Sequence, residues 1–253
     1  MDIDAYLRRI GYTGRTDLTP ETLAGIHRAH FYRVPFENLD ISLGRRIEVD
    51  GAVNFDKIVG AGRGGFCLEL SGLLAGVLRQ MGFHVDVLGG RVLAPTGELS
   101  VPFSHMTLLV HLDEPWIVDV GFGGRIARPL RLNERGSQDA DGRRHVVAND
   151  GDHWFVTVNE PGNTAMTYVF TLEPRDFAEF EDVCNWLQTS PDSRFTQGPM
   201  VSLATPDGRK TYGGGRFILT SGEERAERAV TESEQPALLR EQFGLLIPQA
   251  SPA

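Results

Sequence analysis

The 253-residue sequence predicts an α+β protein made of three successive units, which we place at residues 1–83, 84–189 and 190–253. Apolar residues recur every three or four positions through much of the first unit, which is the period of a helix face. From about residue 84 the period becomes two, and short apolar runs alternate with Gly, Asn and Pro turns. The middle unit is therefore expected to be a small antiparallel barrel or sandwich. The last unit combines two or three strands with a helix.

Start and stop signals mark two helices near the beginning of the chain. Residues 4–10 form a short amphipathic segment that ends at Gly11. Thr19-Pro20 is an N-cap followed by proline at the first helical position, which is a strong start signal. The second helix is expected to run to about Arg33.

Two histidines of the second helix, His27 and His30, lie three residues apart. No third ligand is placed nearby to complete a metal site, so we expect both at the surface or at the edge of the core. The segment that follows, residues 34–40, mixes apolar and polar side chains in what should be irregular backbone. Such a loop either lines a site or packs into the core.

The stretch from Arg63 to Ser71 contains the first candidate for chemistry, Cys67. Two glycines precede the cysteine, and an apolar run with helical spacing follows it, over Leu70, Leu73, Leu74, Val77, Leu78 and Met81. Cys67 therefore begins a mostly buried helix, where free backbone N–H groups and the positive end of the helix dipole favour a thiolate. Arg63 adds a positive charge close by. The alternative is an inert buried thiol, and local context leaves both readings open.

The middle unit is predicted from short strands and the turns between them. The expected strands are residues 84–93, 104–112, 116–120, 144–148, 153–158 and 167–172. A helix should then start in residues 173–176 and run to Leu187, with Cys184 on its apolar side as an inert core thiol.

The third unit has three candidate strands and a helix near its end. They are residues 200–204, 209–212, 216–220 and 232–243. Gly213-Gly214-Gly215 is too short and isolated for a phosphate loop and is read as a turn. Residues 248–253 are expected to be a frayed tail.

The composition limits which cellular location and which binding partners are expected. The formal net charge is −9, so a broad nucleic-acid surface is not expected, although an anionic small molecule could bind a local cluster of donors. The two cysteines, far apart, suit a reducing cytosol better than a disulfide scaffold. The first residues are acidic and mixed rather than signal-like, and no apolar run reaches the roughly 20 residues that span a bilayer. We therefore expect a cytoplasmic protein without a membrane partner.

A cysteine nucleophile needs a base and a group that orients the base, and His105 and Asp119 are the candidates. Asp119 interrupts the apolar strand 116–120, so its carboxylate must be hydrogen-bonded or paired, and an imidazole would supply that pairing. A histidine at a strand end can equally be satisfied by backbone groups. A tight turn at residues 113–115 puts Asp119 opposite Leu109, about 13 Å along the strand from His105. The two meet only through a bulged register or a looser turn.

Four sequence blocks carry a resemblance to a known family. They are Val-Pro-Phe-Glu-Asn-Leu-Asp at 34–40, Arg-Gly-Gly-Phe-Cys-Leu-Glu at 63–69, Phe-Ser-His-Met-Thr-Leu-Leu-Val at 103–110 and Ile-Val-Asp-Val-Gly-Phe-Gly at 117–123. In their order and separations they resemble the arylamine N-acetyltransferases, and the resemblance covers essentially the whole chain. It implies a helical first domain, a central antiparallel β-barrel and a C-terminal α/β lid.

The resemblance also implies the roles of individual residues. It makes Cys67 the nucleophile, His105 the base and Asp119 the orienting carboxylate. It further implies that Phe36, Phe122 and Phe195 line the acceptor pocket, and that the backbone of Gly123 and Gly124 lies close to the acyl donor. Two departures put the identity of the acceptor in doubt: Ser71 stands where the family usually carries asparagine, and the lid is short.

The expected function is transfer of an acetyl or other short acyl group from acyl-CoA, through a Cys67 thioester, to an arylamine or arylhydrazine. The mechanism would be ping-pong and use no metal. One alternative is an amide synthase of the same family, which would act on a polyketide bound to a carrier protein. A papain-like hydrolase shares the triad, but the motif set argues against it. A catalytically silent small-molecule binder gains no support from the intact Cys, His and Asp.

Overall fold

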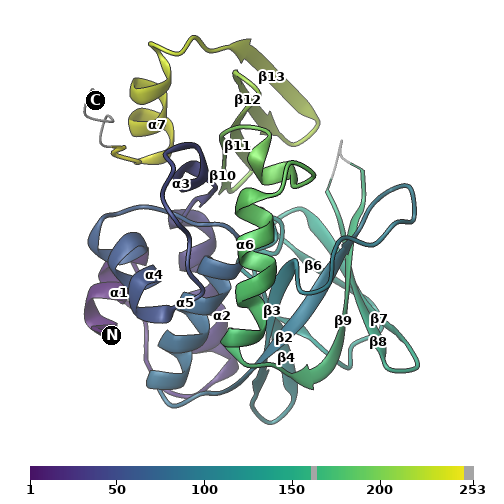
Figure 1. The fold of residues 1–253 in the computed structure, drawn as a ribbon. Coiled ribbons are helices and arrows are strands. Elements are labelled where there is room, and N and C mark those ends of the chain that lie inside the picture. Colours follow the sequence, from purple (N-terminus) through teal and green to yellow (C-terminus); the bar gives the residue numbers. More distant parts are fainter. Residues whose placement is uncertain (161–163, 248–253) are drawn as a thin grey trace.

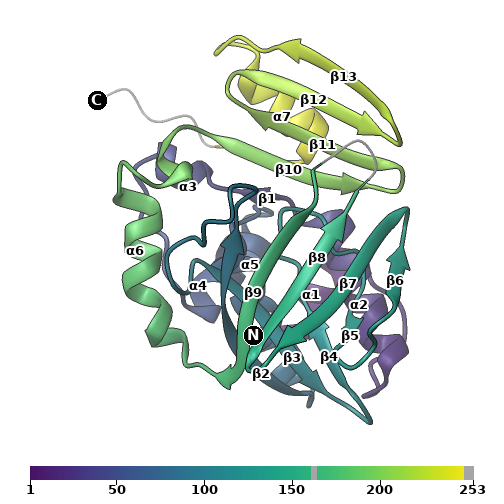
Figure 2. The same cartoon turned by 90° about the vertical axis from the view of Figure 1, so that its right-hand side faces the viewer.

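A computed structural model describes residues 1–160 and 164–247 and confirms the predicted α+β fold. Helices gather on one side of the molecule and an eight-stranded antiparallel sheet curls on the other, while a second sheet with its own helix lies across one end (Figures 1 and 2). Residues 161–163, within the predicted turn between the strands at 153–158 and 167–172, and the expected tail at 248–253 lie outside the described residues.

The helical unit holds the predicted helices and several short ones. They are α1 (Ile3–Ile10), α2 (Pro20–Arg33), α3 (Leu39–Ser42), α4 (Gly51–Phe55), the π-turn η1 (Asp56–Gly60) and α5 (Cys67–Gln80). The Thr19 hydroxyl accepts from the Thr22 amide at 3.3 Å, which confirms the predicted start of α2. Helix α5 is buried on almost every face, because α1, α4 and the barrel all pack around it.

The barrel unit is one sheet in the order β5-β4-β3-β2-β9-β8-β7-β6. Its strands are β2 (His84–Leu93), β3 (His105–His111), β4 (Pro115–Val118), β5 (Leu130–Arg131), β6 (Ser137–Ala140), β7 (Arg143–Asp150), β8 (His153–Asn159) and β9 (Met166–Pro174). The two faces of β3 differ, in line with the period of two predicted for this unit. Met106, Leu108 and Val110 join the core around α5, whereas Leu109 joins the interior of the barrel. Strand β3 is thus the wall shared by the two units.

The helix after the barrel starts later than predicted. Strand β9 continues to Pro174, because Pro174 still pairs with β2 and the Arg175 amide donates to the Val87 carbonyl at 2.8 Å. A 3₁₀ turn, η2 (Phe177–Phe180), then leads into α6 (Glu181–Thr189). Cys184 on α6 is buried against the helical core, as expected.

The lid is a second sheet with the order β1-β10-β11-β12-β13. Its strands are β10 (Met200–Thr205), β11 (Gly208–Gly213), β12 (Arg216–Ser221) and β13 (Glu224–Ala229); the turn η3 (Arg194–Thr196) precedes them and α7 (Gln235–Phe243) follows. The fifth strand, β1 (Phe36–Glu37), comes from the helical unit, where irregular backbone was expected. Phe36 pairs with Ser202 and Glu37 with Val201, so the lid is joined directly to the helical unit.

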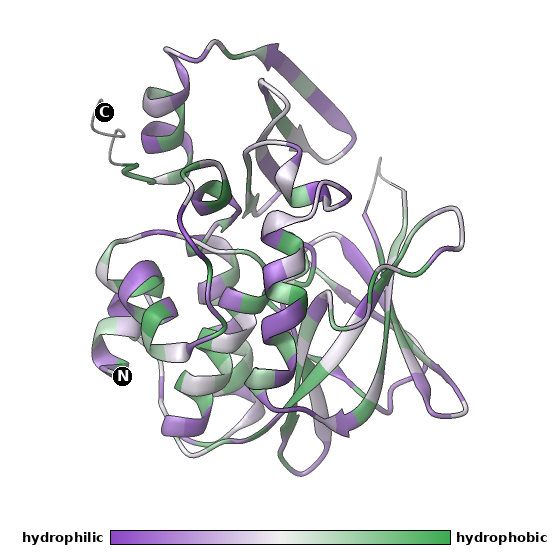
Figure 3. Ribbon diagram, in the orientation of Figure 1, coloured by the Kyte–Doolittle hydropathy of each residue, from purple (hydrophilic) through white to green (hydrophobic). Residues whose placement is uncertain are grey.

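Strand β13 was not predicted, and its sequence explains why. All six of its residues are exposed, and Figure 3 shows a mainly hydrophilic strand. Only backbone pairing with β12 identifies it. Gly214 and Gly215 form the predicted turn between β11 and β12, with φ of 57° and 69°, a region that favours glycine.

We propose the division at 83/84 and 189/190 as the domain organisation, with α6 as a connecting helix that packs on the helical core. Within residues 1–160 and 164–247, no helix combines the length and the apolar character needed to cross a membrane.

Candidate active site

Cys67 is the first residue of α5, where a short loop delivers it against the barrel wall. Gly64 is required in this loop, since a Cβ there would collide with the carbonyl oxygen of Pro35. The next residue, Gly65, bridges to Phe36, so the loop lies alongside β1 before α5 begins. Cys67 is only 4% exposed, and its Sγ lies 3.4 Å from the carbonyl oxygen of Ser104, just before β3.

His105 and Asp119 meet directly. His105 Nε2 lies 2.7 Å from Asp119 Oδ2, and both residues are buried. The register expected from sequence is wrong by two residues: the turn is placed so that His111 pairs with Pro115 and Leu108 with Val118. Strand β4 ends at Val118, and Asp119 comes level with Thr107 rather than Leu109. The side chain of Asp119 therefore has to span only the two residues between Thr107 and His105, about 7 Å along the strand.

The pair with Asp119 controls the charge of His105. Burial by itself lowers the pKa of the imidazole, but the charge and hydrogen bond of Asp119, with a smaller contribution from Cys67, raise it to about 10. Because Nε2 faces Asp119, Nδ1 is the ring nitrogen left for Cys67. At neutral pH the ring is therefore an imidazolium beside the cysteine, an arrangement that stabilises a thiolate.

Two aromatic rings enclose His105. Its ring centroid is 5.2 Å from that of Phe122 and 4.7 Å from that of Tyr168. The Tyr168 hydroxyl lies 3.3 Å from Thr107 Oγ1, and burial followed by the nearby Asp119 charge raises the pKa of Tyr168 well above its ordinary value. The phenol thus stays neutral beside the carboxylate. Tyr168 was missed, because a tyrosine in a strand looks like an ordinary strand former.

His27 of α2 lies against the peptide backbone of Asp119. Its Nε2 is 3.1 Å from the Asp119 carbonyl oxygen and 3.3 Å from the Asp119 amide nitrogen. The expectation that His27 and His30 lie at the surface or core edge is wrong, since each is 1% exposed. Burial lowers the pKa of His27 to about 4, so its ring is neutral at pH 7. In the sequence His27 looks like any histidine on a helix face, so nothing indicated its contact with Asp119.

The three phenylalanines of the predicted acceptor pocket fall into two groups. Phe36 and Phe195 are neighbours, with ring centroids 6.1 Å apart, and Phe66 packs edge-on against Phe195 at 5.7 Å. Phe122 belongs instead to the barrel interior beside His105. Phe66, the residue before Cys67, links the first group to the start of α5. It was not among the predicted pocket residues.

Arg63 does not act on Cys67 as the sequence predicted. It is buried, and its guanidinium pairs with Glu37 at 2.7 Å and with Asp40 at 3.1 Å, so its charge is already compensated. Lys57 continues the network with contacts of 2.7 Å to both Asp40 and Glu69. These five residues fasten β1, α3 and η1 beneath the first turn of α5.

Glu69 connects this network to the helix start. Its Oε2 accepts from the Phe66 amide at 3.0 Å, which is half of a capping box. Burial raises the pKa of Glu69 to about 7, although Lys57 opposes the shift. The carboxyl group two residues after Cys67 therefore holds its proton more tightly than an ordinary glutamate.

Ser71 occupies the next turn of α5 and lies wholly inside the protein. Its hydroxyl donates to the Met106 carbonyl at 2.9 Å and ties α5 to β3. A Cβ on Gly121 would stand 3.0 Å from Ser71 Oγ and 2.9 Å from Cys67 Cα. Glycine at 121 is therefore what allows the loop after Asp119 to pass over the start of α5.

Gly123 and Gly124 lie in that same loop, with φ of 60° and 72°. Arg125 and Arg209 each donate to the Gly123 carbonyl at 3.2 Å, and both lie near Glu160. Burial first, and Arg209 second, lower the pKa of Arg125 to about 10. Because Arg125 and Arg209 share the single carboxylate of Glu160, positive charge exceeds negative charge beside the two glycines.

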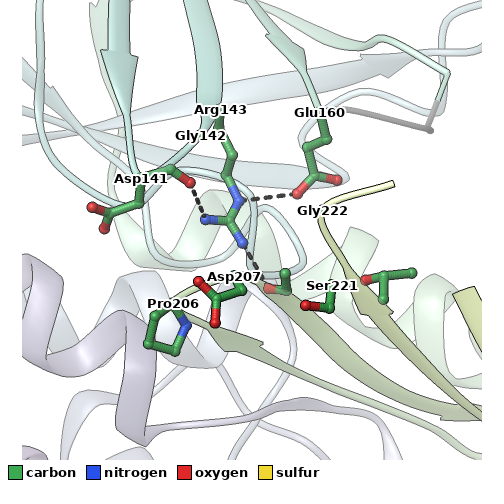
Figure 4. Close-up of a pocket in the computed structure, with 10 residues that line it drawn as sticks. Asp141, Gly142, Arg143, Glu160, Pro206, Asp207, Ser221 and Gly222 are labelled. Atoms are coloured by element: carbon green, nitrogen blue, oxygen red, sulfur yellow. Dashed lines mark hydrogen bonds and ion pairs between the residues drawn. The ribbon is translucent and has the colours of Figure 1, made fainter. Parts of the chain in front are cut away.

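A third arginine, Arg143, fastens the lid to the barrel next to this cluster. Its guanidinium donates to Glu160 at 3.0 Å, to the Asp141 carbonyl at 3.2 Å and to the Gly208 carbonyl at 2.8 Å (Figure 4). A cavity of about 460 Å³ opens beside it, between barrel turns and lid turns. None of the predicted site residues lines that cavity, so we assign it to the lid–barrel junction rather than to the chemistry.

A cysteine at a helix start, an imidazolium beside it and a carboxylate that orients the ring form a site suited to cysteine-dependent acyl transfer. Comparison with known proteins agrees with this class. An N-acetyltransferase family model matches residues 19–251. The chain belongs to the arylamine N-acetyltransferase family.

The relatives span nearly the whole chain. The arylamine N-acetyltransferase of Escherichia coli K12 is 32% identical, over 98% of this chain and 90% of the relative. The pineal gland isozyme NAT-3 of Gallus gallus is 34% identical, over 98% and 95%. The structure of the Mycobacterium smegmatis enzyme matches with a TM-score of 0.90 at 32% identity, covering 97% of this chain and 92% of that one. The Mycobacterium marinum enzyme in complex with CoA matches with a TM-score of 0.87 at 28% identity, covering 96% and 93%.

Proposed function

We propose that this protein is an acyltransferase that moves an acetyl or other short acyl group from acyl-CoA to an arylamine or arylhydrazine through a thioester on Cys67. The contact that carries the proposal is the one between His105 Nε2 and Asp119 Oδ2, 2.7 Å long, next to a cysteine at a helix start. Family membership supplies the substrate class. In this proposal Cys67 is the nucleophile, His105 the acid and base, and Asp119 the residue that orients His105.

The first half-reaction acylates the cysteine. The donor supplies an acyl group activated as a thioester. Cys67 Sγ attacks the carbonyl carbon and forms a new carbon–sulfur bond. When the tetrahedral adduct collapses, the bond to the sulfur of CoA breaks, and His105 Nδ1 gives its proton to that leaving sulfur. Asp119 keeps Nε2 occupied throughout, so Nδ1 is the nitrogen available for the proton.

The second half-reaction regenerates the thiolate. The acceptor nitrogen attacks the thioester carbonyl, and His105, now neutral, takes the proton that the nitrogen loses. Cys67 leaves as a thiolate beside the reformed imidazolium. The attacking amine must be uncharged, so weakly basic anilines and hydrazines suit the site better than alkylamines, which are protonated at pH 7. We place the aromatic ring of the acceptor against Phe36, Phe122 and Phe195, since flat rings stack and bury well on such side chains.

The donor side is proposed at Gly123 and Gly124. Glycines with positive φ let a ligand approach the backbone closely. The excess of arginine charge next to Gly123 suits the phosphates of an anionic donor. The related Mycobacterium marinum structure contains CoA, which agrees with this choice of donor.

The amide-synthase alternative, with its carrier-protein partner, is not favoured, because the relatives named above are arylamine N-acetyltransferases. We also propose a cytoplasmic location. Cys67 and Cys184 are both free thiols, which suits a reducing compartment.

The test is intact-protein mass spectrometry after mixing with a panel of acyl-CoAs, followed by steady-state kinetics. We expect acetyl-CoA to add one acetyl group at Cys67 before any amine is present. Acetyl-CoA with an aniline should then give parallel double-reciprocal plots, the signature of a ping-pong reaction. Intersecting plots without an acyl-enzyme mass would refute the mechanism. Labelling only by long acyl thioesters would reject the short-acyl assignment.

A further inference from the structure

Three potential ligand side chains, His84, Asp86 and His111, meet at one end of the barrel, on the strand faces that carry Leu88 and Leu109 into the barrel interior. His84 and His111 stand directly opposite each other on β2 and β3, and Asp86 follows two residues along β2 on the same face. Their ligand atoms all lie within 4.8 Å of one another, and among the described residues this is the one such group. It lies at the far end of β3 from His105, six residues or about 20 Å away.

The arrangement places two imidazoles around one carboxylate. His111 Nε2 is 2.7 Å from Asp86 Oδ2, and His84 Nε2 is 4.0 Å from Asp86 Oδ1. The two imidazole rings are stacked with centroids 4.4 Å apart. Both Nε2 atoms thus face the Asp86 carboxylate, so two nitrogen ligands and one oxygen ligand border the same small space, which suits a shared cation.

We propose that His84, Asp86 and His111 form a binding site for a divalent first-row transition metal such as Zn²⁺ or Ni²⁺. Imidazole nitrogen with one carboxylate oxygen is a donor set that these metals accept, whereas Mg²⁺ and Ca²⁺ prefer oxygen ligands alone. Metal–nitrogen bonds of about 2.0–2.1 Å require His84 to turn inward. That side chain is 73% exposed and has room to do so. Water would complete the coordination shell.

A metal here would clip the start of β2 to the end of β3, next to the turn into β4. These two strands position Gly90 and His105 at their other ends. The site is separate from acyl transfer, so the proposal does not depend on the proposed function. Its direct consequence is a more stable β2–β3 pair, because a ligand that binds only the folded state stabilises it.

Isothermal titration calorimetry with Zn²⁺ tests the site. The chain should be untagged and carry Cys67→Ser, because a free thiolate can itself bind Zn²⁺. Cys184 can stay, because it is buried. We expect one equivalent to bind, and His84→Ala and His111→Ala each to weaken binding by at least about tenfold. His153→Ala removes another exposed histidine, at the start of β8, and should bind like the parent.

Thermal unfolding gives a second readout. Zn²⁺ should raise the unfolding midpoint of the parent chain, and at the same concentration it should raise that of His111→Ala by clearly less. The proposal is overturned if both histidine variants bind like the parent, if only one of them loses affinity, or if no stoichiometric binding is seen up to about 1 mM Zn²⁺, well above the range of specific sites.

Discussion

His27 Nε2 lies within 3.1–3.3 Å of both backbone polar atoms of Asp119, at the point where β4 has ended and no strand partner remains. The side chain of His27 thus contacts the backbone groups of Asp119 that a neighbouring strand would otherwise pair with. This contact fixes the backbone of Asp119, whose carboxylate orients His105.

We expect His27→Ala to slow acylation of Cys67 on the order of 10²-fold, because a small misplacement of a catalytic group is that costly. Burst kinetics with acetyl-CoA measures the rate. His30→Ala is the matched control: it removes an equally buried histidine of α2, whose Nδ1 is 2.8 Å from the Tyr6 hydroxyl. Equal loss of acylation in both variants, at equal loss of stability, would show that His27 is only a packing residue.

Asp119→Asn should lower the acylation rate by about 10⁴-fold, as in the serine triad, because the amide favours the wrong imidazole tautomer. It should also lower the pKa of His105, which Asp119 does most to raise. The pH at which iodoacetamide begins to modify Cys67 would then move upward. A folded variant with a near-normal rate would mean that this carboxylate is structural.

Cys67 should react with iodoacetamide near pH 6, since the imidazolium of His105 persists to about pH 10 and supports a thiolate. Cys184 should be slow throughout, because burial raises its pKa to about 12. Peptide mapping after timed alkylation compares the two sites within one sample. Modification of Cys184 first would contradict the assignment of the nucleophile.

Glu69 should make the free energy of unfolding depend on pH. Its pKa rises from 4.5 to about 7 on folding. The folded chain therefore keeps the proton longer, and this contribution is present below pH 4.5 and lost as pH rises through 7. At 1.36 kcal/mol per pH unit the loss is about 3 kcal/mol.

Urea unfolding of the parent and of Glu69→Gln from pH 4 to pH 8 should reveal this term as a difference between the two curves. Glu179→Gln is the control, since Glu179 holds the same capping-box position at the start of η2 but is exposed. Parallel curves for the parent and Glu69→Gln would refute the raised pKa.

Phe195→Leu should affect only the second half-reaction. The change keeps apolar bulk but removes the ring, so kcat/KM for an aniline should fall roughly 2- to 10-fold while acylation by acetyl-CoA is unchanged. Phe217→Leu, in the lid beside Phe243, is the control for general effects on the lid. An equal effect on acylation would place Phe195 outside the acceptor pocket.

Much of the fold could be predicted from sequence, because its signals are local. The N-cap at Thr19, the alternation along β3 and the apolar run after Cys67 each express a preference of the segment itself. Strand β13 and the helical turns at 51–60 escaped prediction, since their side chains carry no clear apolar period. Those elements exist because neighbours pair with them or pack on them.

The candidate site divides along the same line. Cys67, His105 and Asp119 could be named because each is unusual in its own segment, and the family resemblance added their roles. Their meeting could not be derived, since it depends on a two-residue difference in the β3–β4 turn. The contact of His27 with Asp119 joins residues 92 positions apart and had no local signal.

The lid sheet is anchored at one edge and open at the other. Phe36 and Glu37 of β1 pair with β10, while β13 ends the sheet with every residue exposed. Residues can therefore be inserted or deleted at the open edge without disturbing the opposite edge, which holds Phe36. The β12–β13 turn is thus a natural place to graft a peptide tag or a loop. Changes in the size of the lid at the open edge therefore leave Phe36, which we propose lines the acceptor pocket, in place.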